Sequence, residues 1–507
     1  MQSTPHFTAP RSAILISAAI AGLAGNLLLR GGQWRAGFAL WIAGLALTVC
    51  LIGGHTSRER MLLLVGIAAA ALGLACRDAQ LLYAIDMLSV LCMGALLIWQ
   101  GTGRSLRDLT LVRTLRVGVI SALNTVGGAA RLLAYTDVDA ATSSATRRNI
   151  RALTIGIAIA ALPLFLVTGL LSASDIVFSR LLDTVFSTVV SDGLSHLAIA
   201  MLLAWITAGW FRAALGHPIG NAIPDPRSPG LPFISLSVVL YALLVLLLAF
   251  VITQARVLFG GAEFLRVTEN LSVATYARDG FFQLIAASGV VLATLVMAEW
   301  LLSDDDTQAR RRFQVMSAML LALVALLLVS SAARILLYIN DFGLSVDRAF
   351  ATAAIVWVFG VLVTFAVTTL RGHSDRFMST AIVVTVAWVT LLNLANPEAL
   401  VVHVNVARAV EGRQFDASYH AQLSADALPA MRSLADTLPP ADCDALNFAL
   451  RASWAKRLAD PEEGRGDWRS SNLPLLYARA WFAALPPPAC QPRALSAEAG
   501  ARSRADD

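Results

Sequence analysis

The sequence predicts an all-α protein: a polytopic bundle of about eleven transmembrane helices, followed by a small C-terminal α-helical domain outside the membrane. Hydrophobic residues make up 57% of the 507 residues and charged residues only 14%, whereas soluble proteins carry roughly 25% charged residues. The mean hydropathy is +0.67. The apolar residues gather in runs close to the length of about 20 residues that crosses a bilayer.

Eleven apolar stretches with few or no charges are the candidate spans. The first follows Arg11 and is longer than the apolar part of a signal peptide, which favours a membrane helix over a cleaved signal. The fourth contains Asp86. The stretches are Ser12–Leu29, Ala36–Gly54, Met61–Cys76, Ala79–Gln100, Ala152–Ser174, Leu194–Phe211, Phe233–Ala255, Gly280–Leu302, Phe313–Ala333, Ala349–Leu370 and Phe377–Ala395.

The spans fall into two groups on either side of an arginine-rich connection. Residues 1–103 are predicted to form an N-terminal membrane region of four helices, and residues 152–395 a core of seven helices. The connection, residues 104–151, holds eight arginines and is predicted to be cytoplasmic. Its apolar piece, Val117–Val126, leaves two interpretations open: an interfacial amphipathic helix, or an ordinary loop with short helices.

The arginines of the short loops predict the orientation. Cytoplasmic loops carry an excess of Lys and Arg. With eleven spans and a cytoplasmic N-terminus, the inner loops hold about twice as many arginines as the outer loops. The arginine distribution therefore predicts a cytoplasmic N-terminus and an extracytoplasmic C-terminal part.

Residues 396–493 are predicted to form the extracytoplasmic helical module, and residues 494–507 a disordered tail. Asp426, Asp442 and Asn472 are predicted N-caps of three helices, and Pro439-Pro440 ends the first of them. Leu446, Leu450, Trp454 and Leu458 give the second helix an apolar face at intervals of four residues.

Two cysteines, Cys443 and Cys490, lie in this module. Because cysteine pairs in an oxidising compartment usually bond, we predict a disulfide between them. The alternative is two unpaired thiols in a cytoplasmic tail.

A cluster of polar residues is predicted at the extracytoplasmic ends of three spans. Tyr276, Asp279 and Gln283 share one helix face, and Arg278 points about 100° away. We expect Asp279 to pair with Arg334 or Arg256. The alternative is that these arginines and the tyrosines anchor helix ends among lipid headgroups. The candidate residues are Tyr276, Arg278, Asp279, Gln283, Arg256, Arg334 and Tyr338.

Asp86 is a separate candidate, because an acidic residue inside a span is costly and often functional. It either binds a proton or cation within the bilayer or lies near the outer interface, close to Arg77 and Asp78.

Other functional classes find no support in the residue patterns. The sequence holds no nucleophile elbow, P-loop or zinc-protease motif, which favours a non-enzyme without settling the question. No cysteine or histidine spacing indicates a metal site, and no cofactor is predicted. The basic residues form no stripe with interleaved aromatics, so no nucleic acid partner is expected.

Several segments resemble a family of bacterial multi-pass membrane proteins that is catalogued only as a domain of unknown function. The resemblance covers roughly residues 152–434, and its most specific part is the Tyr-Ala-Arg-x-Gly-Phe string. It implies a fold and a topology but no activity. The segments are Phe259–Gly261, Tyr276–Leu284, Arg334–Tyr338, Phe342–Ser345, Asn396–Asn405 and Leu423–Pro429, of which the last two resemble the family's junction between the final span and the tail.

Three functions remain open. The first is an envelope sensor, regulator or assembly scaffold whose exported module contacts a protein partner. The second is a transporter or channel. The third is a membrane-embedded transferase that acts on a lipid-linked substrate. Membrane lipids are expected partners in all three.

Overall fold

The computed structural model describes residues 9–30, 34–54, 57–134, 192–216, 230–268, 281–302, 307–459 and 467–484, with a few further residues between 167 and 180. The secondary structure of these residues is helical, apart from one isolated bridge between Leu231 and Leu302. The chain divides into two compact units. Unit 1 comprises Met1–Ala75, Asp86–Pro226 and Asp467–Ser470; unit 2 comprises Cys76–Ile85, Arg227–Gly466 and Ser471–Asp507.

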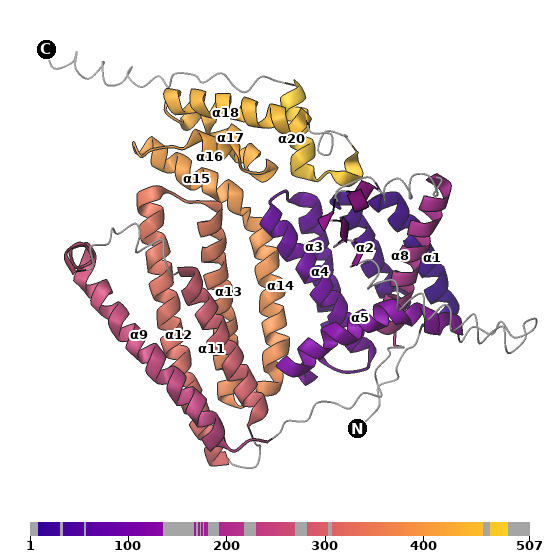
Figure 1. Ribbon diagram of the computed structural model, residues 1–507, viewed down its shortest axis with the longest axis horizontal. Helices are drawn as coiled ribbons and strands as arrows, with labels where there is room; N and C mark the ends of the chain where they lie inside the picture. The colour runs from indigo at the N-terminus through magenta and orange to yellow at the C-terminus, as the bar shows by residue number, and fades with distance from the viewer. Residues whose placement is uncertain are drawn as a thin grey trace, which may run out of the picture. The chain divides into compact units, whose positions relative to one another are not determined.

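Unit 1 is built from the N-terminal helices (Figure 1). Helices α1 and α8 pack closely, since a Cβ atom added to Gly22 would lie 2.4 Å from the carbonyl oxygen of Ala200. Small residues allow such an approach between membrane helices. The helices are α1 (Arg11–Leu29), α2 (Ala36–Ile52), α3 (Arg58–Cys76), α4 (Gln80–Gly101), α5 (Leu111–Ala134) and α8 (Asp192–Ala214), with 3-10 turns η1 (Leu106–Asp108) and η6 (Trp468–Ser470). The last residue of α3 and the first turns of α4 belong to unit 2.

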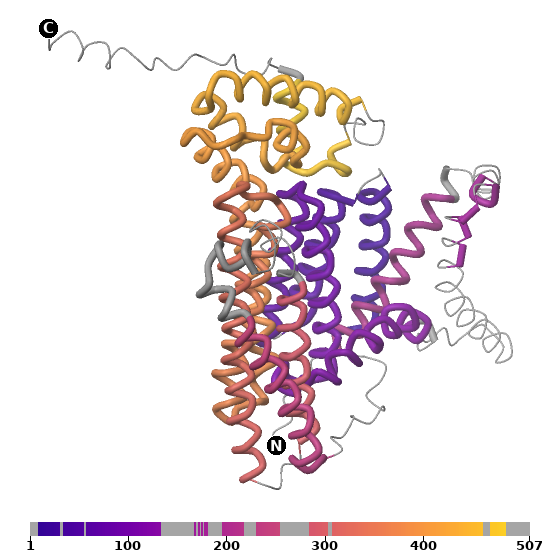
Figure 2. Tube along the Cα trace, turned by 60° about the vertical axis from the view of Figure 1, so that its left-hand side comes forward, coloured from indigo at the N-terminus to yellow at the C-terminus, as the bar shows by residue number. Residues whose placement is uncertain are grey.

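Unit 2 contains five long helices and a C-terminal module. The long helices are α9 (Phe233–Thr268), α11 (Phe281–Leu301), α12 (Thr307–Phe342), α13 (Val346–Thr368) and α14 (Phe377–Ala395), with turns η2 (Thr369–Arg371) and η3 (Ser374–Arg376). The C-terminal module comprises α15 (Pro397–Val410), α16 (Ala417–Ala421), η4 (Ala425–Ala427), α17 (Leu428–Leu434), η5 (Ala435–Thr437), α18 (Pro440–Ala459) and α20 (Leu473–Ala484). Figures 1 and 2 show this module at one end of α12, α13 and α14.

The described residues include nine helices that are long and apolar enough to cross a membrane, and each overlaps one of the eleven predicted stretches. A tenth stretch forms α2, which is apolar but has only 17 residues. The remaining stretch, Ala152–Ser174, lies almost entirely outside the described residues. The protein is therefore a helical membrane protein, and the count of eleven spans stays a prediction.

The described part of the arginine-rich connection, residues 104–134, contains the short turn η1 and one long helix, α5. Leu115, Val119 and Leu123 are exposed along one side of it at intervals of four residues, whereas Ser121 and Asn124 are buried. Figure 1 shows α5 lying across the direction of α3 and α4. This pattern of exposed and buried side chains is the one expected of an amphipathic helix. Its place at the membrane interface stays a prediction.

The cores of unit 2 follow from the apolar periodicity. Phe313, Leu320, Val324 and Leu328 bury one face of α12 against the neighbouring long helices. The module has its own core, to which Val401, Leu428, Leu446, Leu450 and Trp454 contribute. The predicted apolar face of α18 is confirmed at Leu446, Leu450 and Trp454, which are all buried.

The predicted helix caps of the module are partly correct. Asn472 caps α20, because its Oδ1 atom accepts the backbone N–H of Leu475 at 2.9 Å. Asp442 lies in the first turn of α18 rather than at its cap. The cap predicted at Asp426 is wrong: the hydroxyl of Ser424 caps this segment, and the Asp426 carboxylate binds another part of the chain.

Candidate functional site: a carboxylate junction under the C-terminal module

Two aspartates of unit 2 that are far apart in the sequence, Asp78 and Asp426, each accept hydrogen bonds from backbone N–H groups at or next to the other. The Oδ2 atom of Asp426 accepts hydrogen bonds from the backbone N–H groups of Asp78 at 2.8 Å and Ala79 at 2.9 Å. In return, Asp78 Oδ2 accepts the backbone N–H of Ala425 at 3.0 Å. Asp78 and Ala79 directly precede α4. The Asp426 carboxylate therefore fixes the backbone immediately ahead of this helix, from 348 positions away.

Asn472 binds the same short segment from α20. Its Nδ2 atom donates to Asp78 Oδ1 and to the carbonyl oxygen of Arg77, both at 2.9 Å. Because its Oδ1 atom is the cap of α20, this single side chain joins the starts of two helices. The Arg77 guanidinium in turn donates to the carbonyl oxygen of Asn393, in the last turn of α14, at 2.7 Å.

Asn396 connects the end of α14 to the module. It is the one non-glycine residue with positive φ among those described, at 49°, a conformation that asparagine tolerates better than most residues. Its Nδ2 atom donates to the carbonyl oxygen of Asp426 at 3.0 Å, and its Oδ1 atom caps α15 by accepting the N–H of Ala399 at 3.2 Å. The change of direction after α14 is thus tied to the loop that carries Asp426.

Glu398 holds the other end of that loop. Its Oε2 atom accepts both the backbone N–H and the hydroxyl of Ser424 at 2.7 Å. We refer to Asp78, Asn396, Glu398, Asp426 and Asn472 as the carboxylate junction.

The junction carries acidic groups that are shielded from water. Asp426 is 2% exposed and Glu398 is 6% exposed. Burial raises the pKa of the Asp426 carboxyl, and the hydrogen bonds from Ala79 and Asp78 offset only part of that shift. Burial also raises the pKa of Glu398. The Oδ1 atom of Asp426 is buried without a hydrogen-bond partner among the described residues. A proton on that oxygen would relieve the cost of the buried charge.

A second contact joins the module to the turn between α12 and α13. The side-chain amide of Asn405 donates to the carbonyl oxygen of Leu344 and accepts its N–H, both at 2.8 Å. Gly343 precedes this pair with φ at 81°, and a Cβ atom there would lie 2.6 Å from Asn405 Oδ1. The turn therefore requires glycine for two reasons, its backbone conformation and its closeness to α15.

The module also supplies charged and polar groups to both helix ends at this turn. Arg408 donates to the carbonyl oxygens of Asn340 and, at 3.1 Å, Asp341, in the last turn of α12. A cation in this place favours the helix C-terminus. The hydroxyl of Tyr419 accepts the N–H of Val346 at 2.8 Å, at the start of α13. The module thus satisfies backbone groups at the ends of α4, α12 and α13.

The buried carboxyl groups of the junction can bind a proton, and its hydrogen bonds attach the module to the helix ends. In the described part of the chain, no three His, Cys, Asp or Glu residues are placed to hold a metal ion.

The polar cluster predicted around Asp279 is only partly within the described residues. Tyr276, Arg278 and Asp279 lie outside them, as does the side chain of Arg256. Gln283 is exposed near the start of α11, and Arg334 is buried in α12. The ring of Tyr338 lies 4.0 Å from the Arg348 guanidinium carbon. The pairing of Asp279 with Arg334 or Arg256 stays a prediction.

Of the remaining predicted residues, Asp86 and Cys443 are buried. Asp86 is fully buried in the second turn of α4. Cys443 is buried on α18, and Cys490 lies outside the described residues, so the disulfide also stays a prediction. The free cysteines among the described residues are Cys50, Cys76 and Cys92, all in the predicted spans.

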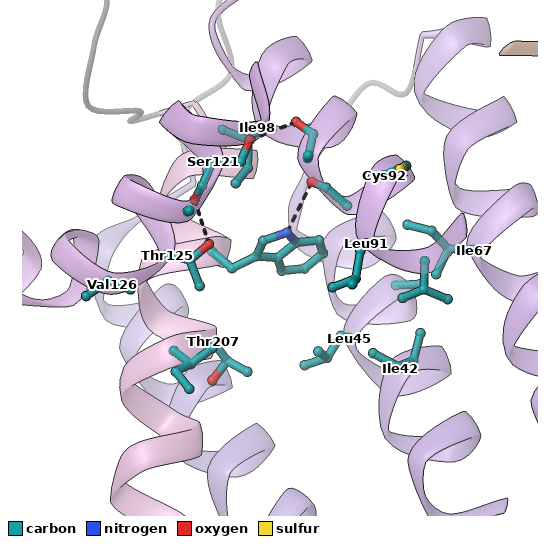
Figure 3. Close-up of a pocket in the computed structure, with 18 of the residues that line it drawn as sticks. Ile42, Leu45, Ile67, Leu91, Cys92, Ile98, Ser121, Thr125, Val126 and Thr207 are labelled. Carbon is teal, nitrogen blue, oxygen red and sulfur yellow. Dashed lines mark hydrogen bonds between the residues drawn. The ribbon is translucent and has the colours of Figure 1, made fainter. Parts of the chain in front are cut away.

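Unit 1 contains a cavity of about 580 Å³. Its walls come from α2, α3, α4, α5 and α8 and are mostly apolar. Figure 3 shows Ser121, Thr125 and Val126 facing Leu91 and Ile67 across it.

Sequence reasoning missed the junction although it noticed some of its parts. The sequence indicates Asp426 only as a local helix cap, and Asp78 only as a residue near the outer interface. A signal was available: the segments Asn396–Asn405 and Leu423–Pro429, which carry the family resemblance at the end of the last span, contain Asn396, Glu398, Asn405 and Asp426.

Comparison with known proteins identifies the family. The family model described as "Domain of unknown function (DUF4153)" matches residues 64–434. This range includes Asp78, Glu398 and Asp426 but ends before Asn472. No curated protein matches the chain, and no solved structure matches it. The model covers well over half of the 507 residues, and the resemblance found in the sequence is confirmed: this integral membrane protein belongs to the DUF4153 family.

Proposed function

We propose that the protein is a non-enzymatic membrane scaffold or sensor, in which the C-terminal module contacts a protein partner and the carboxylate junction couples that contact to the membrane helices. The observation that carries the proposal is the bonding of Asp426 to the backbone ahead of α4. A module on a flexible tether would need no such contact. A module that reports on the membrane part, or acts on it, needs a fixed attachment.

The cavity supports this proposal over a solute transporter. A transport pathway for ions or polar solutes is lined by polar or charged groups that reach the middle of the membrane. The lining of the described cavity is mostly apolar.

The outer face of α18 is the part of the module that we propose meets the partner. Phe448 is 77% exposed there, and Ala445 and Ala452 are exposed one turn to either side. An exposed aromatic residue on a helix is a frequent anchor of protein interfaces.

Photo-crosslinking from α18 tests the proposal. A photoreactive phenylalanine analogue at position 448 should give a discrete protein adduct in cell membranes. The same analogue at Val290, which is exposed on α11, should give none, because that helix faces lipid. The absence of any protein adduct from positions 445, 448 and 452 would contradict the scaffold proposal.

The proposed location is a bacterial inner membrane, with the N-terminus in the cytoplasm and the module outside it. The arginine distribution supports this orientation. In that compartment Cys443 and Cys490 would form the predicted disulfide, which closes a loop that stabilises the module by about 4 kcal/mol in the chain-entropy account.

The single lysine of the chain gives a direct test of orientation. Lys456 is exposed on α18. The other residues counted among the 39 Lys and Arg residues are all arginine. A membrane-impermeant amine reagent applied to intact cells should modify the peptide that contains Lys456, and the variant Lys456→Arg should lose this label. Labelling only after the inner membrane is opened would place the module in the cytoplasm.

A further inference from the structure

The cavity of unit 1 lies among helices that are long and apolar enough to cross the membrane. Candidate spans α3, α4 and α8 line it together with α2 and α5. Its volume of about 580 Å³ lies within the range of about 300–1,000 Å³ found for ligand sites. A void of this size left empty would deprive its walls of packing contacts, so in a membrane it must be filled.

The polar side chains of the lining already have partners, and those partners are backbone oxygens of the bundle itself. The hydroxyl of Ser121 donates to Ala95, that of Thr125 to Ser121 and that of Thr207 to Leu203.

The two tryptophans of the lining behave in the same way. Trp41 Nε1 donates to the carbonyl oxygen of Ala21 at 2.9 Å, and Trp210 Nε1 to that of Gly94 at 3.2 Å. These donors are therefore committed to the bundle. A buried water needs two to four polar partners, which this lining does not offer. The lining therefore favours an occupant whose part inside the cavity has no polar groups.

The cavity reaches the surface of unit 1. Four lining residues, Leu91, Cys92, Gly118 and Ala122, are exposed. They come from α4 and α5, so the opening lies between these two helices. At the level of an apolar span such an opening faces the hydrocarbon of the bilayer, whose bulk is phospholipid acyl chain.

The volume of the cavity favours a hydrocarbon chain over a helix as its occupant. One turn of α-helix with its side chains is about 10–12 Å wide and 5.4 Å long, and so occupies roughly 400–600 Å³. The cavity would hold about one such turn, which is too little to seat a partner helix or a further span of this chain. A flexible hydrocarbon chain fits the same volume without that constraint.

We propose that this cavity binds an acyl chain of a membrane phospholipid, which enters between α4 and α5. When bound there, the acyl chain fills the space between α5 and the spans α3, α4 and α8. The site is independent of the scaffold function proposed above.

Gly118 offers a clean way to block the site. It lines the cavity, and a Cβ atom added to it meets no heavy atom within 4 Å. Gly118→Phe therefore fills the cavity without pushing the backbone. Gly289, an exposed helical glycine of α11 in unit 2, also has open space around it, so Gly289→Phe is the matched control. Ala122→Phe blocks the opening from the same helix and is a second variant if Gly118→Phe fails to fold.

The experiment uses the full chain in vesicles of phosphatidylethanolamine and phosphatidylglycerol that contain phosphatidylcholine with a diazirine in one acyl chain. After irradiation, peptide mapping should find adducts concentrated on Leu91–Ala95 and Gly118–Val126. These adducts should be lost in Gly118→Phe and retained in Gly289→Phe. Equal adducts in both variants, or adducts spread evenly over all spans, would overturn the proposal. Capture of a diazirine polyprenyl phosphate in place of the phospholipid would overturn it as well.

Discussion

Asp78 and Asp426 each hold the backbone beside the other: Asp426 Oδ2 accepts the N–H of Asp78 at 2.8 Å, and Asp78 Oδ2 accepts the N–H of Ala425 at 3.0 Å. One aspartate precedes α4, and the other lies in the loop before α17. Both lie in the region that the family model matches. The contact joins the two ends of that region and is the centre of the proposed coupling.

Removal of the Asp426 carboxylate should destabilise the attachment of the module. In Asp426→Ala the N–H groups of Asp78 and Ala79 lose their acceptor, and the buried N–H of Ala79, left unpaired, costs about 1–3 kcal/mol. We expect a lower midpoint of thermal unfolding for purified protein in detergent. Asp436→Ala is the control, because Asp436 is exposed in η5 of the same module. An equal midpoint in the two variants would show that the contact contributes no stability.

The junction should also make stability depend on pH. Burial raises the pKa of Asp426 above its value in the unfolded chain, so the folded state binds the proton more tightly. The stabilisation from that proton is complete below the unfolded value of about 3.9 and is lost as the pH rises through the folded value. Relative to Asp426→Asn, the wild-type protein should therefore gain stability as the pH falls from neutral.

The difference between wild type and variant is the quantity to measure, because other groups titrate in the opposite sense. Burial lowers the pKa of His420, so that residue destabilises the module as the pH falls below about 6.5. His420 is present in both proteins, and its effect cancels in the difference of their unfolding midpoints. A difference that stays constant between neutral and mildly acidic pH would contradict proton binding at Asp426.

The turn between α12 and α13 should not tolerate a side chain at Gly343. In Gly343→Ala the left-handed backbone conformation costs about 1–2 kcal/mol of folding free energy. The new Cβ atom would also lie 2.6 Å from Asn405 Oδ1. Gly372 has nearly the same φ, 80°, but open space around it, so Gly372→Ala isolates the backbone cost. We expect the fall in unfolding midpoint to be clearly larger for Gly343→Ala. Equal falls would mean that Asn405 moves away without loss.

The crossing of α5 and α8 should be equally sensitive at Gly209. A Cβ atom there would lie 2.1 Å from the carbonyl oxygen of Thr125, so Gly209→Ala must force the two helices apart. Gly289→Ala meets no atom and should be neutral or stabilising by up to about 1 kcal/mol, since alanine is the better helix former. The midpoint of thermal unfolding of the purified protein measures the effect, and we expect a clear fall for Gly209→Ala. A midpoint equal to that of the wild type would contradict the close crossing.

Much of the fold could be predicted from the sequence because it depends on local pattern. Apolar runs near the length of a bilayer predicted the spans, and the spacing of Leu446, Leu450 and Trp454 predicted the buried face of α18. The cap at Asn472 was also predicted, since capping involves residues only three positions apart. The same reasoning misplaced Asp426, because a carboxylate two residues before a helix looks like a local cap wherever its real partner lies.

The junction itself could not be predicted in this way. Its partners, Asp78 and Asp426, are separated by almost the whole membrane region, and no periodicity relates them. The cavity was equally hidden, since it depends on how five helices pack and not on any one of them. Positions such as Gly209, where a close approach demands glycine, are visible in a sequence only as glycines within apolar helices.

Hydrogen–deuterium exchange at the segment before α4 tests the central claim most directly. The measurement compares exchange of the Asp78 and Ala79 amides in wild type, Asp426→Ala and Asp436→Ala, each reconstituted as the full chain in lipid nanodiscs. The proposed coupling predicts slow exchange in wild type and Asp436→Ala and fast exchange in Asp426→Ala. Slow exchange of both amides in all three proteins would show that Asp426 does not hold the start of α4.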